Sequence, residues 1–281
     1  MGKFTGVLLA SDFDNTLIYT EEALRTGAPV PPLPERNREA LAYFMAQGGR
    51  FAVSTGRALA AFFKYAELVP MNAPGVVCNG AALYDFQTGE YLETALLDRL
   101  ALERGQAVLD HFPEAAVEAY HIGNVIYAVH PNEFTRRHEH VTKVGITEAP
   151  SLTEVPLPLG KLLFEAEHGT LAEIAAFLGE RGWAGDYELI FSGQTLLEMT
   201  IRGANKGGMV RRLARRLGIS MDRVYCVGDE ANDISMLTAA REGFAPANCI
   251  PAVRECGATV VCNAREGALA EVVEILDRRF A

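Results

Sequence analysis

The sequence predicts an α/β protein with a Rossmann-like core, in which helices cover both faces of a parallel sheet, and a smaller inserted α+β domain. Toward both ends of the 281-residue chain, short apolar runs alternate with segments of helical periodicity, which is the pattern of a parallel sheet covered by helices. The middle of the chain instead has short alternating runs and a proline-rich piece at 150–158, which favour a mixed unit. We therefore assign residues 1–85 and 191–281 to a discontinuous core and 86–190 to the inserted domain.

Each strand expected in the core is a short apolar run. These strands cover 6–10, 51–54, 75–78, 224–227 and 259–261. The helices between them have apolar residues at helical spacing, and the first has Pro34 at its start and Gly48 after its end, the positions that these residues favour. The expected core helices cover 34–47, 58–67, 206–217, 232–240 and 268–279.

In the inserted domain, residues 85–90 have the composition of a hairpin turn between two short strands. Further runs alternate as antiparallel strands do. These runs cover 117–120, 125–129, 162–167 and 188–191. Helical patterns at 98–111 and 170–180 complete the α+β character of the insertion.

Composition and charge exclude several classes of function. The formal net charge is −10, and the densest basic stretch, 211–216, has its charges at helical spacing around leucines, so we expect a solvated helix face and no nucleic-acid partner. No apolar run approaches the ~20 residues needed to span a bilayer, and the apolar stretch 7–10 is too short for a signal peptide. The five cysteines form no C-x-x-C pair, which indicates neither disulfides nor zinc and favours a cytoplasmic location.

The first expected strand leads into a pair of carboxylates, Asp12 and Asp14. Residues two apart in an extended chain point to the same side, and open parallel sheets bind ligands at the carboxyl ends of their strands. Such a pair can hold a divalent cation and divide the roles of nucleophile and general acid or base. An ordinary polar turn explains this motif about equally well.

The second and third expected strands also lead into polar residues. Thr55, Gly56 and Arg57 follow the second strand, where a hydroxyl and the exposed N–H groups of a helix start can bind a phosphoryl oxygen. A simple helix N-cap is the competing explanation and, taken alone, the better one. Asn79 follows the third strand, as a tight turn or as a polar contact at the same edge.

Two further motifs lie near the C-terminal end. Lys206 begins an expected helix, although the helix dipole disfavours a cation there, so the lysine is expected to face an anion. Asp229, Asn232 and Asp233 follow an apolar strand within the stretch 228–233. Acids crowded at such a point need a neutralising cation, although an N-capped helix with acids in its first turn is also plausible.

Together these motifs resemble the haloacid dehalogenase superfamily of phosphatases, and most closely its Cof-type branch, which has a large C2-type cap domain in the position of the insertion. The resemblance covers the core from end to end. It comprises DxDxT at 12–16, TGR at 55–57, NG at 79–80, the lysine motif at 206 and GDExNDxxM at 228–236. One departure is Asn15, where the branch usually has Gly; Asn tolerates unusual backbone dihedrals, so we expect the loop to keep its shape.

The resemblance implies a Mg²⁺-dependent phosphatase acting on a small phosphorylated metabolite. In it, Asp12 would be the nucleophile that becomes an aspartyl-phosphate, and Asp14 the acid and base. Mg²⁺ would be held by Asp12, the backbone carbonyl of Asp14 and Asp229. The remaining roles concern the phosphoryl group and its surroundings. Thr55 and Lys206 would stabilise the phosphoryl oxygens; Gly56, Arg57, Asn79 and Asn232 would bind phosphate or substrate; and Asp233 would orient Lys206 or a metal-bound water.

Two rival functions remain open. A phosphotransferase such as a sugar phosphomutase could use the same core, and a non-catalytic regulator could bind a phosphorylated metabolite without turnover. In the cap, we expect His138 and His140 at the surface because they lie two apart in a helix, and Lys161 either to contact an anionic group or to be exposed. The sequence gives neither the substrate nor the oligomeric state.

Overall fold

The computed structural model describes residues 2–280 and confirms the α/β fold class. Its core is a five-stranded sheet in the order β14-β13-β12-β1-β2, in which every neighbouring pair is parallel. The five strands are β1 (Leu8–Ser11), β2 (Arg50–Val53), β12 (Val224–Val227), β13 (Glu242–Pro246) and β14 (Thr259–Val261). β12 is the middle strand and β1 lies between β12 and β2, so the residues that follow β1 and β12 emerge side by side in the interior of the sheet edge.

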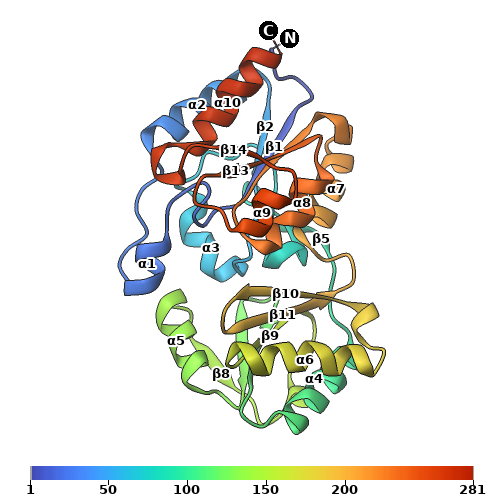
Figure 1. The fold of residues 1–281 in the computed structure, drawn as a ribbon. Coiled ribbons are helices and arrows are strands. Elements are labelled where there is room, and N and C mark those ends of the chain that lie inside the picture. Colours follow the sequence, from blue (N-terminus) through green and yellow to red (C-terminus); the bar gives the residue numbers. More distant parts are fainter. Residues whose placement is uncertain (1, 281) are drawn as a thin grey trace.

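Helices cover both faces of this sheet (Figure 1). The faces alternate along β1, where Leu9 belongs to one apolar cluster and Leu8 and Ala10 to the other, as the two-residue period of a strand requires. The first cluster includes side chains of α2 (Glu35–Ala46), α3 (Leu59–Ala66) and α10 (Ala268–Arg279). The second includes side chains of α7 (Lys206–Arg216), α8 (Ile234–Ala239) and α9 (Pro251–Glu255).

The run at 75–78 does not extend the five-stranded sheet as predicted. β3 (Gly75–Val77) starts a separate antiparallel sheet with β4 (Ala82–Asp85) and β5 (Glu90–Thr94). A single parallel bridge, between Ser54 and Val76, joins β3 to the end of β2. Asn79, in the 3₁₀ turn Cys78–Gly80, therefore still reaches the neighbourhood of Thr55. The predicted turn at 85–90 is confirmed as the connection between β4 and β5.

The second domain is a six-stranded sheet in the order β10-β11-β9-β6-β7-β8. Its pairs are antiparallel except for β7 with β8. The strands are β6 (Ala116–His121), β7 (Val125–Val129), β8 (Ile146–Glu148), β9 (Leu159–Glu165), β10 (Tyr187–Gly193) and β11 (Leu196–Ile201). Helices α4 (Arg99–His111) and α6 (His168–Glu180) pack on the face turned away from the core, as Figure 1 shows. The opposite face is turned toward the core.

The sheet pairing corrects the predicted boundaries of the insertion. The boundary at 190/191 falls inside β10, and β11, which we had placed in the core, pairs with β9 and β10 in the six-stranded sheet. At the other end, β5 pairs with β4 rather than with the insertion. The alternation of side chains along a single strand does not reveal which sheet the strand joins. The sequence pattern alone therefore could not place the boundary correctly. We propose that the inserted domain spans about residues 95–202.

Two core elements also differ from the sequence prediction. The sequence prediction does not include β13, because this short strand contains Gly243 and ends in Pro246, residues that count against a strand. The expected helix at 232–240 divides into a 3₁₀ turn (Ala231–Asp233) and α8. Among residues 2–280, the remaining α-helices are α1 (Glu21–Thr26) near the end of β1 and α5 (Glu133–Thr142) in the inserted domain. Within residues 2–280, no helix has the length and apolarity that crossing a membrane requires.

Candidate active site

The predicted site residues meet at the carboxyl edge of the parallel sheet. Asp12 directly follows β1, Asp229 lies two residues beyond β12, and Lys206 is the first residue of α7. The helix begins there because the side chain of Asn205 accepts a hydrogen bond from the N–H of Gly208, at 2.7 Å, and so caps it. Three separate segments of the core thus bring charged side chains to one place.

Lys206 is buried between two carboxylates. Its Nζ lies 2.6 Å from Oδ1 of Asp12 and 2.6 Å from Oδ1 of Asp233, and its side chain is 1% exposed. Burial opposes the ammonium charge, but the two carboxylates outweigh it and raise the pKa of Lys206 above its ordinary value. The lysine therefore stays charged at the helix start, as its position in the sequence suggests.

Asp233 holds this arrangement in place through both of its carboxylate oxygens. While Oδ1 accepts the bond from Lys206, Oδ2 accepts from the backbone N–H groups of Asp229 and Glu230, at 2.9 and 3.0 Å. The two roles expected for Asp233 were to orient Lys206 or to orient a metal-bound water. The geometry favours the first, because Asp233 contacts Lys206 directly. It also ties the loop that carries Asp229 to the lysine.

Three carboxylates at this edge could hold a cation. Asp12, Asp229 and Asp233 each offer an oxygen within 4.8 Å of the others, and Thr16 Oγ1 donates to Asp229 Oδ1 at 2.6 Å. Burial raises the pKa of Asp12 to about 8 and that of Asp229 to about 9, against the opposing effects of Lys206 on Asp12 and of Thr16 on Asp229. Carboxylate oxygens crowded away from water are a donor set that suits Mg²⁺, so the residues fit that ion.

The Asp14 carboxylate is not part of this acidic group. Both of its oxygens accept bonds from Arg57, whose Nε and Nη2 each lie 2.7 Å away, and Thr20 Oγ1 donates to Oδ1. The Arg57 guanidinium also stacks over the rings of Phe13 and Tyr65. Arg57, which we had assigned to phosphate, is therefore bound to the expected acid and base.

The remaining phosphate candidates form a hydrogen-bonded chain that reaches the inserted domain. Asn79 Oδ1 accepts from Asn232 Nδ2 at 2.9 Å, and Asn79 Nδ2 donates to Glu198 of β11 at 2.7 Å. Thr55 is buried, and its hydroxyl accepts from the N–H of Arg57 at 3.1 Å, which is the capping contact that competes with a phosphate role. A side chain at Gly56 would crowd Asn79, because a Cβ would lie 3.0 Å from Asn79 Oδ1.

Asn15 confirms the expectation for the altered position in the first motif. Its φ is 53°, in the left-handed region that Gly favours. The side-chain Oδ1 accepts from the N–H groups of Thr20 and Glu21, at 3.0 and 2.8 Å. The Asn side chain therefore stabilises the loop instead of straining it.

A cavity of about 510 Å³ opens above these residues, between the two domains. Asp12, Asp14, Arg57 and Asn232 line its floor. The roof combines apolar side chains with polar ones of the inserted domain. The apolar ones include Ile126, Phe134, Val141, Val144, Leu163 and Leu196, and the polar ones Tyr120, Arg137, His138, Lys161 and Glu198.

Two of these roof residues, Lys161 and His138, are more buried than a surface position would allow. Lys161 is neither exposed nor free: it is 4% exposed, and its Nζ donates to Glu198 Oε2 at 3.0 Å and to the Gly56 carbonyl at 3.3 Å. The expectation that His138 lies at the surface is wrong. Its side chain is only partly exposed, and its Nδ1 lies 2.9 Å from Oε2 of the buried Glu118. The available signal was the placement of charged residues within strands, at Glu118 and Lys161, where the alternation puts them opposite the apolar core.

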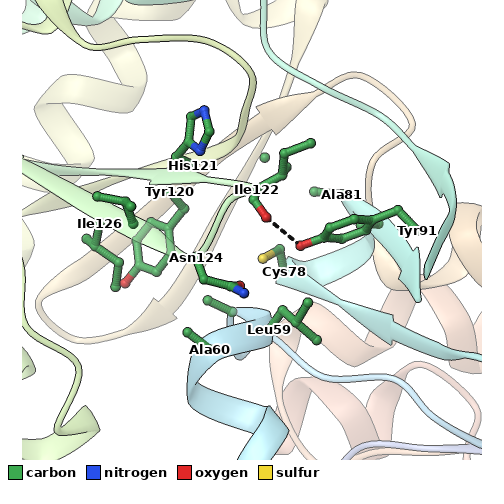
Figure 2. A pocket seen from close by; sticks show the side chains of 14 residues that line it. Leu59, Ala60, Cys78, Ala81, Tyr91, Tyr120, His121, Ile122, Asn124 and Ile126 are labelled. Carbon is green, nitrogen blue, oxygen red and sulfur yellow. Dashed lines mark hydrogen bonds between the residues drawn. The ribbon is translucent and has the colours of Figure 1, made fainter. Parts of the chain in front are cut away.

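A much smaller crevice, of about 20 Å³, lies where the β4–β5 hairpin meets the inserted domain. Figure 2 shows Tyr91 pointing to the backbone of Ile122, to whose carbonyl its hydroxyl donates at 2.8 Å, with Cys78 and Leu59 nearby. This volume has room for about one water molecule. The crevice is a packed seam between the domains, and the larger cavity is the candidate substrate site.

Gly207 sets the distance between α7 and α8 and so the position of Lys206. A Cβ at Gly207 would lie 2.0 Å from the carbonyl oxygen of Ser235. We expect Gly207→Ala to lower the free energy of unfolding by at least about 1–3 kcal/mol, as overpacking does, and to weaken the Lys206 contact with Asp233. Gly179→Ala in α6 is the matched control, because no atom lies within 4 Å of its Cβ position. Urea unfolding of both variants tests this, and equal stability would contradict it.

Comparisons with known proteins agree with this geometry. The family model of haloacid dehalogenase-like hydrolases matches residues 9–273. YxeH of Bacillus subtilis is 28% identical over 262 residues, covering 88% of this chain and 90% of that protein. The pyridoxal phosphate phosphatase YbhA of Escherichia coli is 24% identical over 280 residues, covering 95% and 97%.

Solved structures share the fold. The sugar phosphatase BT4131, of HAD subclass IIB, superposes with a TM-score of 0.80 at 19% identity and covers 96% of this chain and 99% of its own. BT1666 from Bacteroides thetaiotaomicron gives a TM-score of 0.82 at 16% identity, covering 98% and 96%. At these identities the likeness concerns the fold alone. The family match, over nearly the whole chain, leads to the conclusion that this protein belongs to the haloacid dehalogenase-like hydrolases and is a phosphoric monoester hydrolase.

Proposed function

We propose that the chain is a Mg²⁺-dependent phosphatase that hydrolyses a small phosphorylated metabolite through an aspartyl-phosphate on Asp12. The observation that carries the proposal is the buried Lys206 shared by Asp12 and Asp233, beside Asp229 and beneath a cavity. Buried charges are costly unless they are paired. A cluster of them at a cavity floor is better explained by a role in catalysis than by stability.

Asp12 is the nucleophile in this proposal. Lys206 holds its Oδ1, so we assign the attack on phosphorus to Oδ2. The bond from Oδ2 to phosphorus forms as the bond to the leaving oxygen breaks, and water then cleaves the aspartyl-phosphate to release inorganic phosphate. Lys206 would place its charge beside the transferring phosphoryl oxygens, where electrostatic stabilisation contributes most to the rate.

Asp14 is assigned to proton transfer, first to the leaving oxygen and then from the attacking water. The bidentate bond from Arg57 occupies both oxygens of the Asp14 side chain. Arg57 also lines the cavity, so an anionic substrate there would compete with Asp14 for the guanidinium. Substrate binding would in this way free Asp14 to act as an acid.

Asp12 and Asp229 would hold Mg²⁺, together with the backbone carbonyl of Asp14. The ion would supply positive charge that neutralises the buried acids and polarises the phosphate. Thr55, Gly56 and Asn232 would contact phosphate. Within residues 2–280, the buried Asn232 Oδ1 has no hydrogen-bond partner and can accept from a donor group of the substrate; a bond to a phosphate oxygen would use Nδ2 instead, because that oxygen is itself an acceptor.

The cavity supports a small substrate. Its volume of about 510 Å³ lies within the usual range of small-molecule sites. Several relatives are named for small phosphorylated compounds, among them pyridoxal phosphate and HMP-PP. We propose a substrate of this size class, and the cytoplasm, where the five free cysteines would stay reduced, as the location.

Release of free phosphate from a generic aryl phosphate, with and without Mg²⁺, tests the proposed function. We expect release that depends on Mg²⁺. Transfer of the phosphate to an added alcohol without free phosphate would favour the phosphotransferase instead. Stabilisation by ligands without any release, with Mg²⁺ binding confirmed, would favour the regulator.

The affinity for Mg²⁺ is expected to rise with pH between 6 and 9. Burial raises the pKa values of Asp12 and Asp229 to about 8 and about 9, and the ion binds only the deprotonated carboxylates. Raising the pH removes the competing protons, so binding tightens and fewer protons are released per ion. Calorimetric titration in buffers of different ionisation enthalpy measures both quantities. An affinity independent of pH would contradict the assignment of these two ligands.

A further inference from the structure

The face of the six-stranded sheet that is turned toward the core carries buried carboxylates that the proposed reaction does not use. Glu118 of β6 and Glu165 of β9 are 1% and 0% exposed. His138 of α5 packs against both, with Nδ1 at 2.9 Å from Glu118 Oε2 and 3.6 Å from Glu165 Oε1. The three residues each offer one ligand atom within 4.8 Å of the others.

The charge of this group is not balanced by its neighbours. Lys161, the nearest buried lysine, is bound to Glu198 at 3.0 Å. Glu118 and Glu165 are thus left with His138, which can supply at most one positive charge for two negative ones. An uncompensated charge in a buried position is costly, so the group calls for a further cation or a proton.

Glu165 is the second indication of a missing ligand. Within residues 2–280, neither of its buried carboxylate oxygens accepts a hydrogen bond, and the 3.6 Å ion contact with His138 is the charge partner that the geometry gives it. The nearby Thr135 hydroxyl donates to Asn132 instead, at 3.3 Å.

The geometry points to a binding site for a divalent transition-metal ion in the inserted domain, formed by Glu118, His138 and Glu165. Zinc bonds to nitrogen and oxygen of ~2.0–2.2 Å place neighbouring ligand atoms about 2.9–3.6 Å apart. The two separations from His138 Nδ1, 2.9 and 3.6 Å, lie in this range. One imidazole with two carboxylates suits Zn²⁺ better than Mg²⁺, which prefers oxygen ligands alone.

The surroundings support this assignment. Tyr120 donates to Glu118 Oε2 at 2.6 Å and so orients this ligand from outside. His138 and Tyr120 both line the large cavity, so a fourth coordination position would face the space above Asp12. An ion there could bind an oxygen or nitrogen of the leaving group. This site would be separate from the Mg²⁺ site in the core.

Zinc retention by the full-length protein without an affinity tag tests the inference. The protein is saturated with Mg²⁺, loaded with Zn²⁺, desalted and analysed for metal content, and the affinity is then measured by calorimetry. We expect one retained zinc per chain in the wild type and in Asp229→Asn, which alters only the core site. Glu165→Gln and His138→Asn are expected to weaken binding by at least about 10-fold, the lower limit for losing even an outer partner.

His140→Asn is the matched control for His138→Asn, because both histidines lie on α5 and His140 is exposed; this variant should retain zinc. Glu165→Gln removes an unpartnered charge at constant shape, so the metal-free variant should remain folded. Zinc that is lost in Asp229→Asn, or that is retained undiminished in Glu165→Gln and His138→Asn, would overturn the inference. The readout is metal content, so failure here is distinct from failure of the proposed phosphatase reaction.

Discussion

Replacing Asp12 with Asn is expected to lower the rate of phosphate release by about 10³-fold or more, the scale of losing a covalent nucleophile. The amide keeps Oδ1 as an acceptor for Lys206, which lies 2.6 Å away, so the fold and the lysine should stay in place. What is lost is the charged oxygen that we propose attacks phosphorus. The measurement is free phosphate from an aryl phosphate at saturating Mg²⁺, beside a thermal unfolding curve that verifies the fold.

Asp14→Asn separates the nucleophile from the acid. With an aryl phosphate whose leaving group needs no proton, this variant should still form the phosphoenzyme, whereas Asp12→Asn should not. Rapid acid quenching with labelled substrate detects the covalent phosphate. Phosphate release by Asp12→Asn at near the wild-type rate would refute the assigned nucleophile.

Lys206→Met is expected to affect both activity and stability. The substitution leaves Asp12 and Asp233 facing each other without the ammonium that lies 2.6 Å from each. Breaking a buried ion pair by removing one partner costs about 3–5 kcal/mol. Urea unfolding at pH 8 without Mg²⁺ should show a loss of this size, and phosphate release should fall to background.

The pH dependence of this loss has a definite sign. In the wild type, burial already raises the pKa values of Asp12 and Asp229. Lys206 lowers the pKa of Asp12, so removing Lys206 should raise this pKa further. A carboxyl whose folded-state pKa exceeds its unfolded value opposes folding at high pH, and protonation relieves the opposition as the pH falls. The stability deficit of Lys206→Met should therefore shrink between pH 8 and pH 6. A deficit that grows over this range would contradict the account.

The sequence predicted the core because its local signals agree with its tertiary structure. Strands buried on both faces read as continuous apolar runs, and the polar residues that follow them mark the ligand edge. Asp12, Asp229 and Lys206 could be placed together for this reason, without knowledge of any distance. β13 escaped the prediction because its Gly243 and Pro246 are residues that strand patterns exclude.

The inserted domain could be predicted only in outline, because its features depend on pairing between distant segments. β11 joins a sheet with β9 and β10 through contacts that no local pattern encodes. His138 lies on a short helix whose orientation decides between solvent and Glu118. The bidentate bond between Arg57 and Asp14 likewise joins two motifs whose roles the resemblance had kept apart.

The interior place of β1, between β2 and β12, has a consequence for synthesis on the ribosome. Its neighbours are β2 on one side and β12 on the other, and β12 emerges only after the whole inserted domain. The proposed domain of residues 95–202 is continuous in sequence and has its own apolar cluster, so it can fold while β1 and β2 still lack the other three strands of their sheet. The apolar faces of these two strands must stay protected during that interval, since nascent strands with open edges aggregate readily. The inserted domain can therefore finish folding before the parallel sheet of the core is complete, because three of the five core strands are made last.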